Sequence, residues 1–140
     1  MYDKHMNLNK QLFNEIAKKA AESPRLRMNY DLRNDGNEQS QRMLNVLLPG
    51  TFVPIHRHPA TSETVVCLEG TCIERYYDNE GNETEKFVLS AGSDLIGLQI
   101  PAGQFHSLEV PAEWKEKAVI IEFKAGKFEP TKKEDILEKA

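Results

Sequence analysis

The sequence predicts an all-β domain, a sandwich or a barrel, preceded by one N-terminal α-helix. From residue 25 onwards the chain consists of short segments rich in β-branched and aromatic residues. They recur at the spacing of roughly 8–12 residues that is typical of sandwiches and barrels. Clusters of Gly, Pro, Asn, Asp and Ser separate the segments. The length of 140 residues suits one domain with one hydrophobic core.

Residues 8–22 are expected to form the helix. Apolar residues recur there at three- and four-residue spacing, with lysines on the opposite side. The apolar positions are Leu8, Leu12, Phe13, Ile16, Ala17 and Ala20. Asn7 is a candidate cap, and Ser23–Pro24 ends the helix. We expect residues 1–22 to provide a helix packed on the barrel, residues 23–130 to form the single β domain, and residues 131–140 to form a tail with a candidate short helix.

Eight segments are expected to be strands: RLRMNYDL, QRMLNVLL, ETVVCLEG, TCIERYYD, EKFVLS, LIGLQI, HSLEV and AVIIEF. The stretch YYDNEGNETEKF predicts a hairpin in which Gly81 takes a positive φ angle. Cys67 and Cys72 are expected to be buried core thiols rather than a disulfide or a soft-metal site. Their odd spacing places them on opposite faces if one strand runs straight through both.

Composition argues against two classes of partner. The net charge is -4, and the charges are mixed in sign along the chain, which argues against a nucleic-acid surface. No run approaches the roughly 18 apolar residues of a membrane span. The start, MYDKHMNLNKQLF, has no apolar stretch typical of a signal peptide. We therefore expect a cytoplasmic protein that binds neither nucleic acid nor membrane.

Four polar residues form a candidate metal site. His56 and His58 are two residues apart, so extended backbone turns both to one face. A short loop can fold the chain back and bring Glu63 beside them, and His106, after the turn at 101–103, can approach from a neighbouring strand. Three imidazoles and one carboxylate bind a divalent metal with one or two positions left open, and Zn, Fe, Ni, Mn and Co all suit this set. The alternative for the two close histidines alone is an exposed polar strand.

The spacing of these residues resembles the motifs of the cupin superfamily. The first motif is matched by Gly50-x5-His56-x-His58-x4-Glu63-x6-Gly70, and the core of the second resembles Pro101-x-Gly103-x2-His106. The resemblance implies a double-stranded β-helix, the cupin jelly-roll barrel, with a metal inside. It implies His56, His58, Glu63 and His106 as the ligands. By analogy with many small cupins, it also implies a homodimer.

Further stretches are similar to the WbuC-type cupin-fold metalloproteins. They are QRMLN at 41–45, PGTF at 49–52, HRHP at 56–59, PAGQFH at 101–106 and EFKAG at 122–126. This resemblance covers roughly residues 23–130. It implies a setting in bacterial surface-polysaccharide (O-antigen) metabolism and a saccharide as the small-molecule ligand, but it supplies no reaction.

Other polar residues are candidates for contact with a substrate. Glu122 is a candidate acid or base, and the alternative is a surface ion pair with Lys124. Gln41 and Asn45 share a face and are candidate substrate-binding residues, or else the wet side of an edge strand. Arg42 is a third candidate, although it lies three residues from Asn45 and faces the other way unless a bulge intervenes.

Three functions are compatible with this set of residues. The first is a metal-dependent enzyme of isomerase, epimerase or lyase type that acts on a sugar or sugar-nucleotide. The alternatives are an Fe(II)-dependent dioxygenase and a non-catalytic module that binds a saccharide or another small ligand. The complete ligand set favours an enzyme, because a pure binding module does not require it. The fold alone does not choose among the three.

Overall fold

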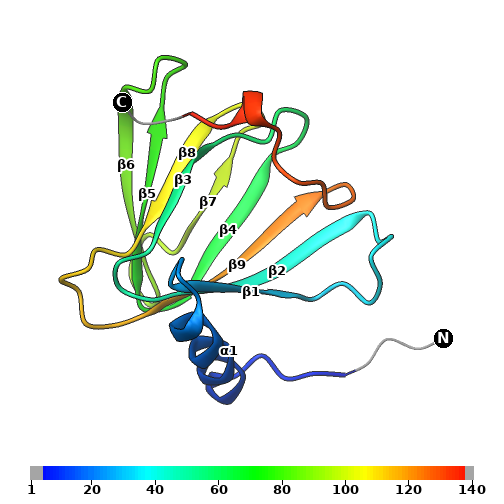
Figure 1. Cartoon of the computed structure of the whole chain (residues 1–140), viewed down its shortest axis with the longest axis vertical. Coiled ribbons are helices and arrows are strands. Elements are labelled where there is room, and N and C mark those ends of the chain that lie inside the picture. The colour runs from blue at the N-terminus through cyan, green and yellow to red at the C-terminus, as the bar shows by residue number, and fades with distance from the viewer. Residues whose placement is uncertain (1–4, 138–140) are drawn as a thin grey trace.

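The computed structural model describes residues 5–137, within which nine strands form two antiparallel sheets that face each other (Figure 1). The strands are β1 (Arg27–Asp31), β2 (Ser40–Leu47), β3 (Phe52–His56), β4 (Glu63–Glu69), β5 (Thr71–Tyr77), β6 (Glu83–Ser90), β7 (Gly97–Ile100), β8 (Phe105–Glu109) and β9 (Ala118–Ala125). The sheets have the orders β1-β2-β9-β4-β7 and β3-β8-β5-β6. This is the predicted jelly roll, with two open sheets rather than a closed barrel. Residues 1–4 of the expected N-terminal segment and residues 138–140 of the expected tail lie outside the described residues.

Helix α1 (Lys10–Glu22) packs on the outer face of the five-stranded sheet. The cap is Asn9 rather than the expected Asn7, and its side chain accepts a hydrogen bond of 3.0 Å from the backbone N–H of Leu12. The buried side of the helix contacts apolar side chains of β2 and β9. The buried members of this cluster are Phe13, Ile16, Leu44, Val46, Val119 and Ile121. The amphipathic pattern thus predicted the buried face correctly, while the first turn starts two residues later.

Strand β3 was not among the eight expected strands. It contains Pro54, which interrupts the pattern of a paired strand. The structure accommodates this proline because β3 lies at the edge of its sheet and its register with β8 shifts between Val53 and His56. Proline lacks a backbone donor and is therefore confined to edges and bulges of sheets.

The turn between β4 and β5 corrects the expectation for the two cysteines. Gly70 has a φ of +74°, and a Cβ atom there would lie 2.1 Å from the carbonyl oxygen of Lys117. The chain therefore reverses at Gly70 instead of running straight through. Cys67 and Cys72 consequently join the same apolar cluster between the sheets, as buried free thiols. The expected hairpin between β5 and β6 is present, with Gly81 at a φ of +86°.

The C-terminal segment crosses back to the four-stranded sheet. A single turn of 3-10 helix, η1 (Lys133–Asp135), falls within the expected tail and is the red coil in Figure 1. The N–H of Leu137 donates to the carbonyl of Ile55 at 2.9 Å, and the N–H of Arg57 donates to the carbonyl of Asp135 at 2.9 Å. The segment therefore borders the stretch that carries two of the candidate metal ligands. Among the described residues, no helix combines the length and apolar character that crossing a membrane requires.

Candidate metal centre

The space between the two sheets is apolar at one end and polar at the other. On β4 the inward side chains run from Cys67 through Val65 to Glu63, and on β8 they run from Leu108 to His106. The two strands lie in opposite sheets, and their polar residues meet at one end of the space, where Glu63 Oε1 lies 3.7 Å from His106 Nε2. Glu63 is 6% exposed and His106 is 2% exposed, so both lie deep in the interior.

The structure brings the four candidate metal ligands together. His56 ends β3 and lies directly across from His106 on β8, with ring centroids 4.3 Å apart. His58 follows two residues later, and one nitrogen from each of the three rings lies within 4.8 Å of the other two. Glu63, at the start of β4, places its Oε2 3.1 Å from His58 Nε2 and its Oε1 3.7 Å from His106 Nε2. Small rotations of these side chains can close the group around one ion.

Hydrogen bonds to backbone carbonyls determine which ring nitrogen of His56 and of His106 is available to a metal. His56 Nδ1 lies 2.8 Å from the carbonyl oxygen of Pro54, and His106 Nδ1 lies 3.0 Å from that of Gln104. A carbonyl only accepts, so each Nδ1 carries the hydrogen and each Nε2 keeps its lone pair. This is the arrangement common to histidines that bind metals. His58 Nε2 is buried and, despite the nearby Glu63, has no well-directed hydrogen bond.

Contacts from three directions hold the backbone of the centre. The N–H of Gly103 donates to the carbonyl of His58 at 2.9 Å, which joins the two motif regions. Between the two close histidines, Arg57 Nε lies 2.8 Å from Asp135 Oδ1, and the guanidinium lies 4.7 Å from the centroid of the Phe105 ring. The stretch from His56 to His58 is therefore restrained by the C-terminal segment, by the turn at 101–103 and by β8.

The electrostatic setting favours binding of a cation. Burial, followed by the nearby charge of His106, lowers the pKa of His56 to about 4, and burial also lowers the pKa of His106. Both rings are therefore neutral at pH 7, which is the form that binds metals. Burial alone would raise the pKa of Glu63, but the His58 ring and the other histidines outweigh it and hold that pKa below its usual value. Neutral imidazoles and one carboxylate are thus available to a divalent ion.

The centre opens into a cavity of about 160 Å³ between the sheets. Gln41, Asn45 and Glu122 line this cavity together with the three histidines and Glu63. Four buried side-chain atoms of the described residues lack a hydrogen-bond partner: Gln41 Oε1, Asn45 Oδ1, His58 Nε2 and Glu74 Oε2. All four residues line this cavity. Since buried polar groups are normally paired, their concentration in one place fits a site that binds a metal and a polar ligand.

Glu122 lies beside Met43 of β2 and Val65 of β4 on the inner face of the five-stranded sheet. Its pKa is raised well above the usual value, first by burial and then by the charge of Glu63. The alternative, a surface ion pair with Lys124, is not formed, because the ammonium lies near Thr61 Oγ1 and the carbonyl of Ala125 instead. Burial inside the cavity thus favours the protonated form of the Glu122 carboxyl group.

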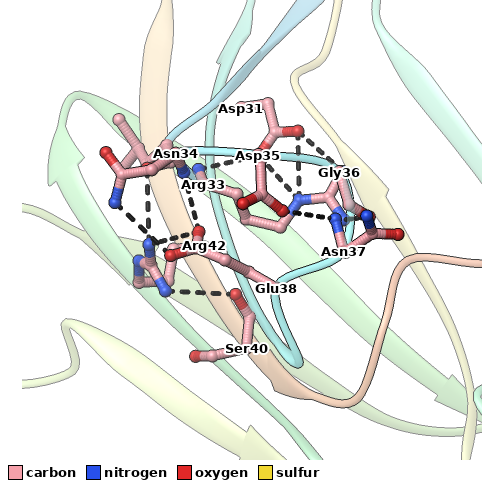
Figure 2. Close-up of polar contacts among 10 residues, drawn as sticks. Asp31, Arg33, Asn34, Asp35, Gly36, Asn37, Glu38, Ser40 and Arg42 are labelled. Carbon is pink, nitrogen blue, oxygen red and sulfur yellow. Dashed lines mark hydrogen bonds and ion pairs between the residues drawn. The ribbon is translucent and has the colours of Figure 1, made fainter. Parts of the chain in front are cut away.

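Arg42 is not brought to the cavity. It lies on the outer face of β2, where its Nη2 is 3.0 Å from Glu38 Oε2 and its Nη1 donates to the carbonyl of Ser40 at 3.2 Å (Figure 2). No bulge interrupts the pairing of β2 with β9, so the alternation along the strand separates Arg42 from Gln41 and Asn45. The cavity-lining residues do not include Arg42.

Three charged residues that line the cavity were not among the candidates named from the sequence. Glu74 on β5 is 2% exposed, and its pKa is raised well above the usual value by burial and by the charge of Glu63. Arg25 and Arg27 line the cavity at the start of β1. In the sequence, Glu74 could have been noticed as a charged residue within the largely apolar strand segment TCIERYY. For Arg27 the signal was its alternation with Asn29, which also lines the cavity.

Three solved structures share the fold at low sequence identity. The capsular polysaccharide assembling protein CapF from Staphylococcus aureus has a TM-score of 0.66 at 20% identity, over 82% of this chain and 32% of the CapF chain. L-ribose isomerase from Cellulomonas parahominis has a TM-score of 0.61 at 14% identity, over 74% and 62%. Oxalate decarboxylase from Bacillus subtilis, with Mn(II) centres, has a TM-score of 0.58 at 20% identity, over 74% and 26%. The chain thus spans about a third of CapF, and these likenesses identify the cupin fold.

Comparison of the sequence with protein families shows the family to which the chain belongs. No curated protein matches the chain. The family described as a domain of unknown function, DUF6016, matches residues 8–89, which is more than half of the 140 residues. This match contains His56, His58 and Glu63. The chain therefore belongs to the DUF6016 family and has the cupin fold.

Proposed function

We propose that this chain is a cytoplasmic metal-dependent enzyme that acts on a sugar or a sugar-nucleotide in bacterial surface-polysaccharide metabolism, in the manner of the WbuC-type cupin-fold metalloproteins. The reaction is an isomerisation, an epimerisation or a lyase reaction. One observation carries the proposal. Three imidazoles and the carboxylate of Glu63 converge at one end of a cavity in which four buried polar atoms lack partners.

The solved structures of the same fold support both parts of the proposal. CapF assembles capsular polysaccharide, and the L-ribose isomerase is an isomerase of a sugar. The Mn(II) centres of oxalate decarboxylase support a divalent ion in a cupin. Because this chain spans about a third of CapF, we take from CapF the carbohydrate setting and not a reaction.

The proposed ligands of the metal are His56, His58, Glu63 and His106. The donor set of neutral imidazoles and one carboxylate suits Zn, Fe, Ni, Mn or Co. When bound, such an ion supplies a Lewis acid that polarises a carbonyl or hydroxyl oxygen of the sugar. The restraints on the backbone from Asp135 and Gly103 keep the ligands in place.

The protein residues around the metal ligands have separate proposed roles. The raised pKa of Glu122 favours its protonated form, and its proposed role is to deliver a proton to the sugar and take it back. The amides of Gln41 and Asn45 orient hydroxyl groups, since neither side-chain oxygen is engaged by the protein. Glu74, buried in the same cavity, adds a second carboxyl group whose pKa is raised by burial.

Metal content tests the site directly. Protein purified from its native host is assayed by elemental analysis, together with His58→Ala and with His5→Ala as the matched control. His5 is exposed and interacts with Asn7, so its replacement leaves the metal unchanged. We expect His58→Ala to lose the metal that the wild type retains. Retention of the same metal by His58→Ala would overturn the assignment of the site.

Turnover on a panel of sugars and sugar-nucleotides tests the reaction. We expect turnover that depends on metal and falls by about 10²- to 10⁴-fold in Glu122→Gln with the metal retained. Full turnover after metal removal would contradict the proposal. Substrate-dependent oxygen consumption with Fe(II) would indicate the dioxygenase instead, and saccharide binding unchanged by a chelator would indicate a binding module.

The proposal includes a homodimer in solution. Light scattering coupled to size-exclusion chromatography measures its mass directly. A mass near that of one chain of 16.0 kDa would contradict this part alone.

A further inference from the structure

Two arginines stand at the cavity without an anionic partner. Arg25 and Arg27 flank the start of β1, and both line the cavity that leads to the histidines. Arg27 Nη1 donates to the carbonyl oxygen of Phe52 at 3.4 Å, which leaves most of its five N–H groups available. Within residues 5–137, the guanidinium of Arg25 forms no hydrogen bond, and neither arginine forms an ion pair.

The backbone between the two arginines is held in an unusual conformation. Leu26 has a φ of +58° and is the only non-glycine residue with a positive φ among those described. Its carbonyl accepts hydrogen bonds from the N–H of Leu48 at 2.9 Å and from Thr51 Oγ1 at 2.8 Å, and its N–H donates to Ser23 at 3.0 Å. A left-handed leucine is unfavourable and persists only where the surroundings enforce it. The bend therefore fixes the direction in which the chain presents Arg25 and Arg27.

The carboxyl groups of the cavity leave these two charges unbalanced. Glu122 is the acidic group whose charge acts on Arg27, but among residues 5–137 it forms no ion pair with either arginine. Glu63 faces the histidines instead. Burial, and next the charge of Arg25, lowers the pKa of Arg27, which is the sign of like charges held close together. Paired guanidinium groups bind oxyanions through parallel hydrogen bonds and are the preferred residues for that task.

We propose that Arg25 and Arg27 bind an oxyanion group on the saccharide ligand, while the hydroxyl-bearing part of the ligand extends between Gln41 and Asn45 towards the histidines. This inference rests on the proposed function, whose substrate class it narrows to sugars that carry a phosphate or a carboxylate. The two sources share one chemistry, and binding experiments separate them.

Calorimetric titration of the metal-containing protein with glucose 1-phosphate, glucuronate and glucose tests the inference. We expect glucose 1-phosphate or glucuronate to bind more tightly than glucose, and the tighter of the two identifies the oxyanion. In Arg25→Gln/Arg27→Gln that ligand should bind about 10- to 100-fold more weakly, as expected for a lost charge-assisted hydrogen bond. The affinity for glucose should stay within the error of the measurement.

Two further variants and a measurement of metal content show whether the weaker binding is specific to Arg25 and Arg27. Arg42→Gln removes an arginine of the neighbouring strand that lies outside the cavity, and it should bind as the wild type does. Arg25→Lys/Arg27→Lys keeps the charge and should recover part of the affinity, which a merely misfolded site would not do. Two results for the metal-containing protein would overturn the inference. One is equal affinity for charged and neutral sugars, and the other is binding of the charged sugar that Arg25→Gln/Arg27→Gln does not weaken. A wild type without metal that still binds a charged sugar through the arginines would instead count against the proposed function.

Discussion

The two ends of the space between the sheets are formed by the same strands but differ in the polarity of their buried side chains. On β9 the inward residues run from Ala118 through Ile120 to Glu122. On β2, Leu47 lies opposite Ala118 and Asn45 lies opposite Ile120, so polar residues begin one inward position earlier on β2. At the apolar end the buried side chains form one cluster, against which partly buried apolar side chains also pack. At the polar end, Asn45 and three other residues each leave a buried atom without a hydrogen-bond partner. One end thus contributes stability, whereas the other leaves buried polar atoms unpaired at a cost in stability, as binding sites commonly do.

The largest expected effect lies at the apolar end. Leu89 on β6 is fully buried in the cluster between the sheets. Leu89→Ala should lower the free energy of unfolding by about 2–5 kcal/mol, through lost burial and the cavity left behind. Urea unfolding measures this loss, and elemental analysis should show unchanged metal content in the folded variant. A stability loss below about 1 kcal/mol, or loss of metal from the folded variant, would remove the distinction between the two ends.

The next largest effect concerns pH and the polar end. The pKa of Glu74 is raised well above its usual value of 4.5 by burial, so the folded state holds a proton that the unfolded state releases. The stability linked to that proton is full below about pH 4.5 and is lost as the pH rises through the folded pKa. Relative to Glu74→Gln, the wild type should therefore lose up to about 1.4 kcal/mol per pH unit above pH 4.5.

Urea unfolding of chelator-treated wild type and Glu74→Gln at several pH values between 5 and 8 measures this difference. Gln retains the size of the side chain and removes the titrating group. Parallel stability curves for the two proteins would show that Glu74 does not hold its proton in the folded state.

The apolar end was accessible to sequence reasoning because burial leaves a periodic pattern. Alternation and turn residues predicted eight of the nine strands and the β5–β6 hairpin. The pattern failed at β3, where Pro54 and an edge position replace regular pairing. It also failed to show that Cys67 and Cys72 share one cluster, because the reversal depends on the close approach of Gly70 to Lys117.

The polar end could be predicted where a motif fixed the spacing or where alternation placed polar residues on one face, as for Gln41 and Asn45. The spacing of His56, His58, Glu63 and His106 predicted which side chains would meet, and the structure brings them together. Glu74 could not be placed in the same way. Apolar residues occupy both faces of β5, so alternation did not indicate which face would be polar. For Arg25 the sequence had no signal, because its position depends on the left-handed backbone at Leu26.

A smaller effect of opposite sign is expected for another residue of the polar end. Asn45 is 6% exposed, and its Oδ1 has no partner. Asn45→Leu should raise the free energy of unfolding by about 1 kcal/mol, because an unsatisfied buried polar group is removed. The same variant should weaken saccharide binding.

Asn9→Ala is the contrast: it removes the cap of α1 and should lower stability by about 1 kcal/mol. Equal destabilisation by both variants, measured in urea, would mean that Asn45 is satisfied in solution.

The smallest expected effect lies outside both ends, on the outer face of β2. Arg42 and Glu38 form an ion pair of 3.0 Å in which both side chains are about 30% exposed. Solvent screens such a pair, so Arg42→Ala should change the free energy of unfolding by less than about 1 kcal/mol. Metal content and saccharide affinity should equal those of the wild type, although Arg42 lies next to Gln41 in the sequence. Gln41→Ala, measured beside it, should leave the metal in place and weaken saccharide binding. Weakened binding in Arg42→Ala would place the ligand on both faces of β2, and the polar end of the space between the sheets would then no longer account for binding by itself.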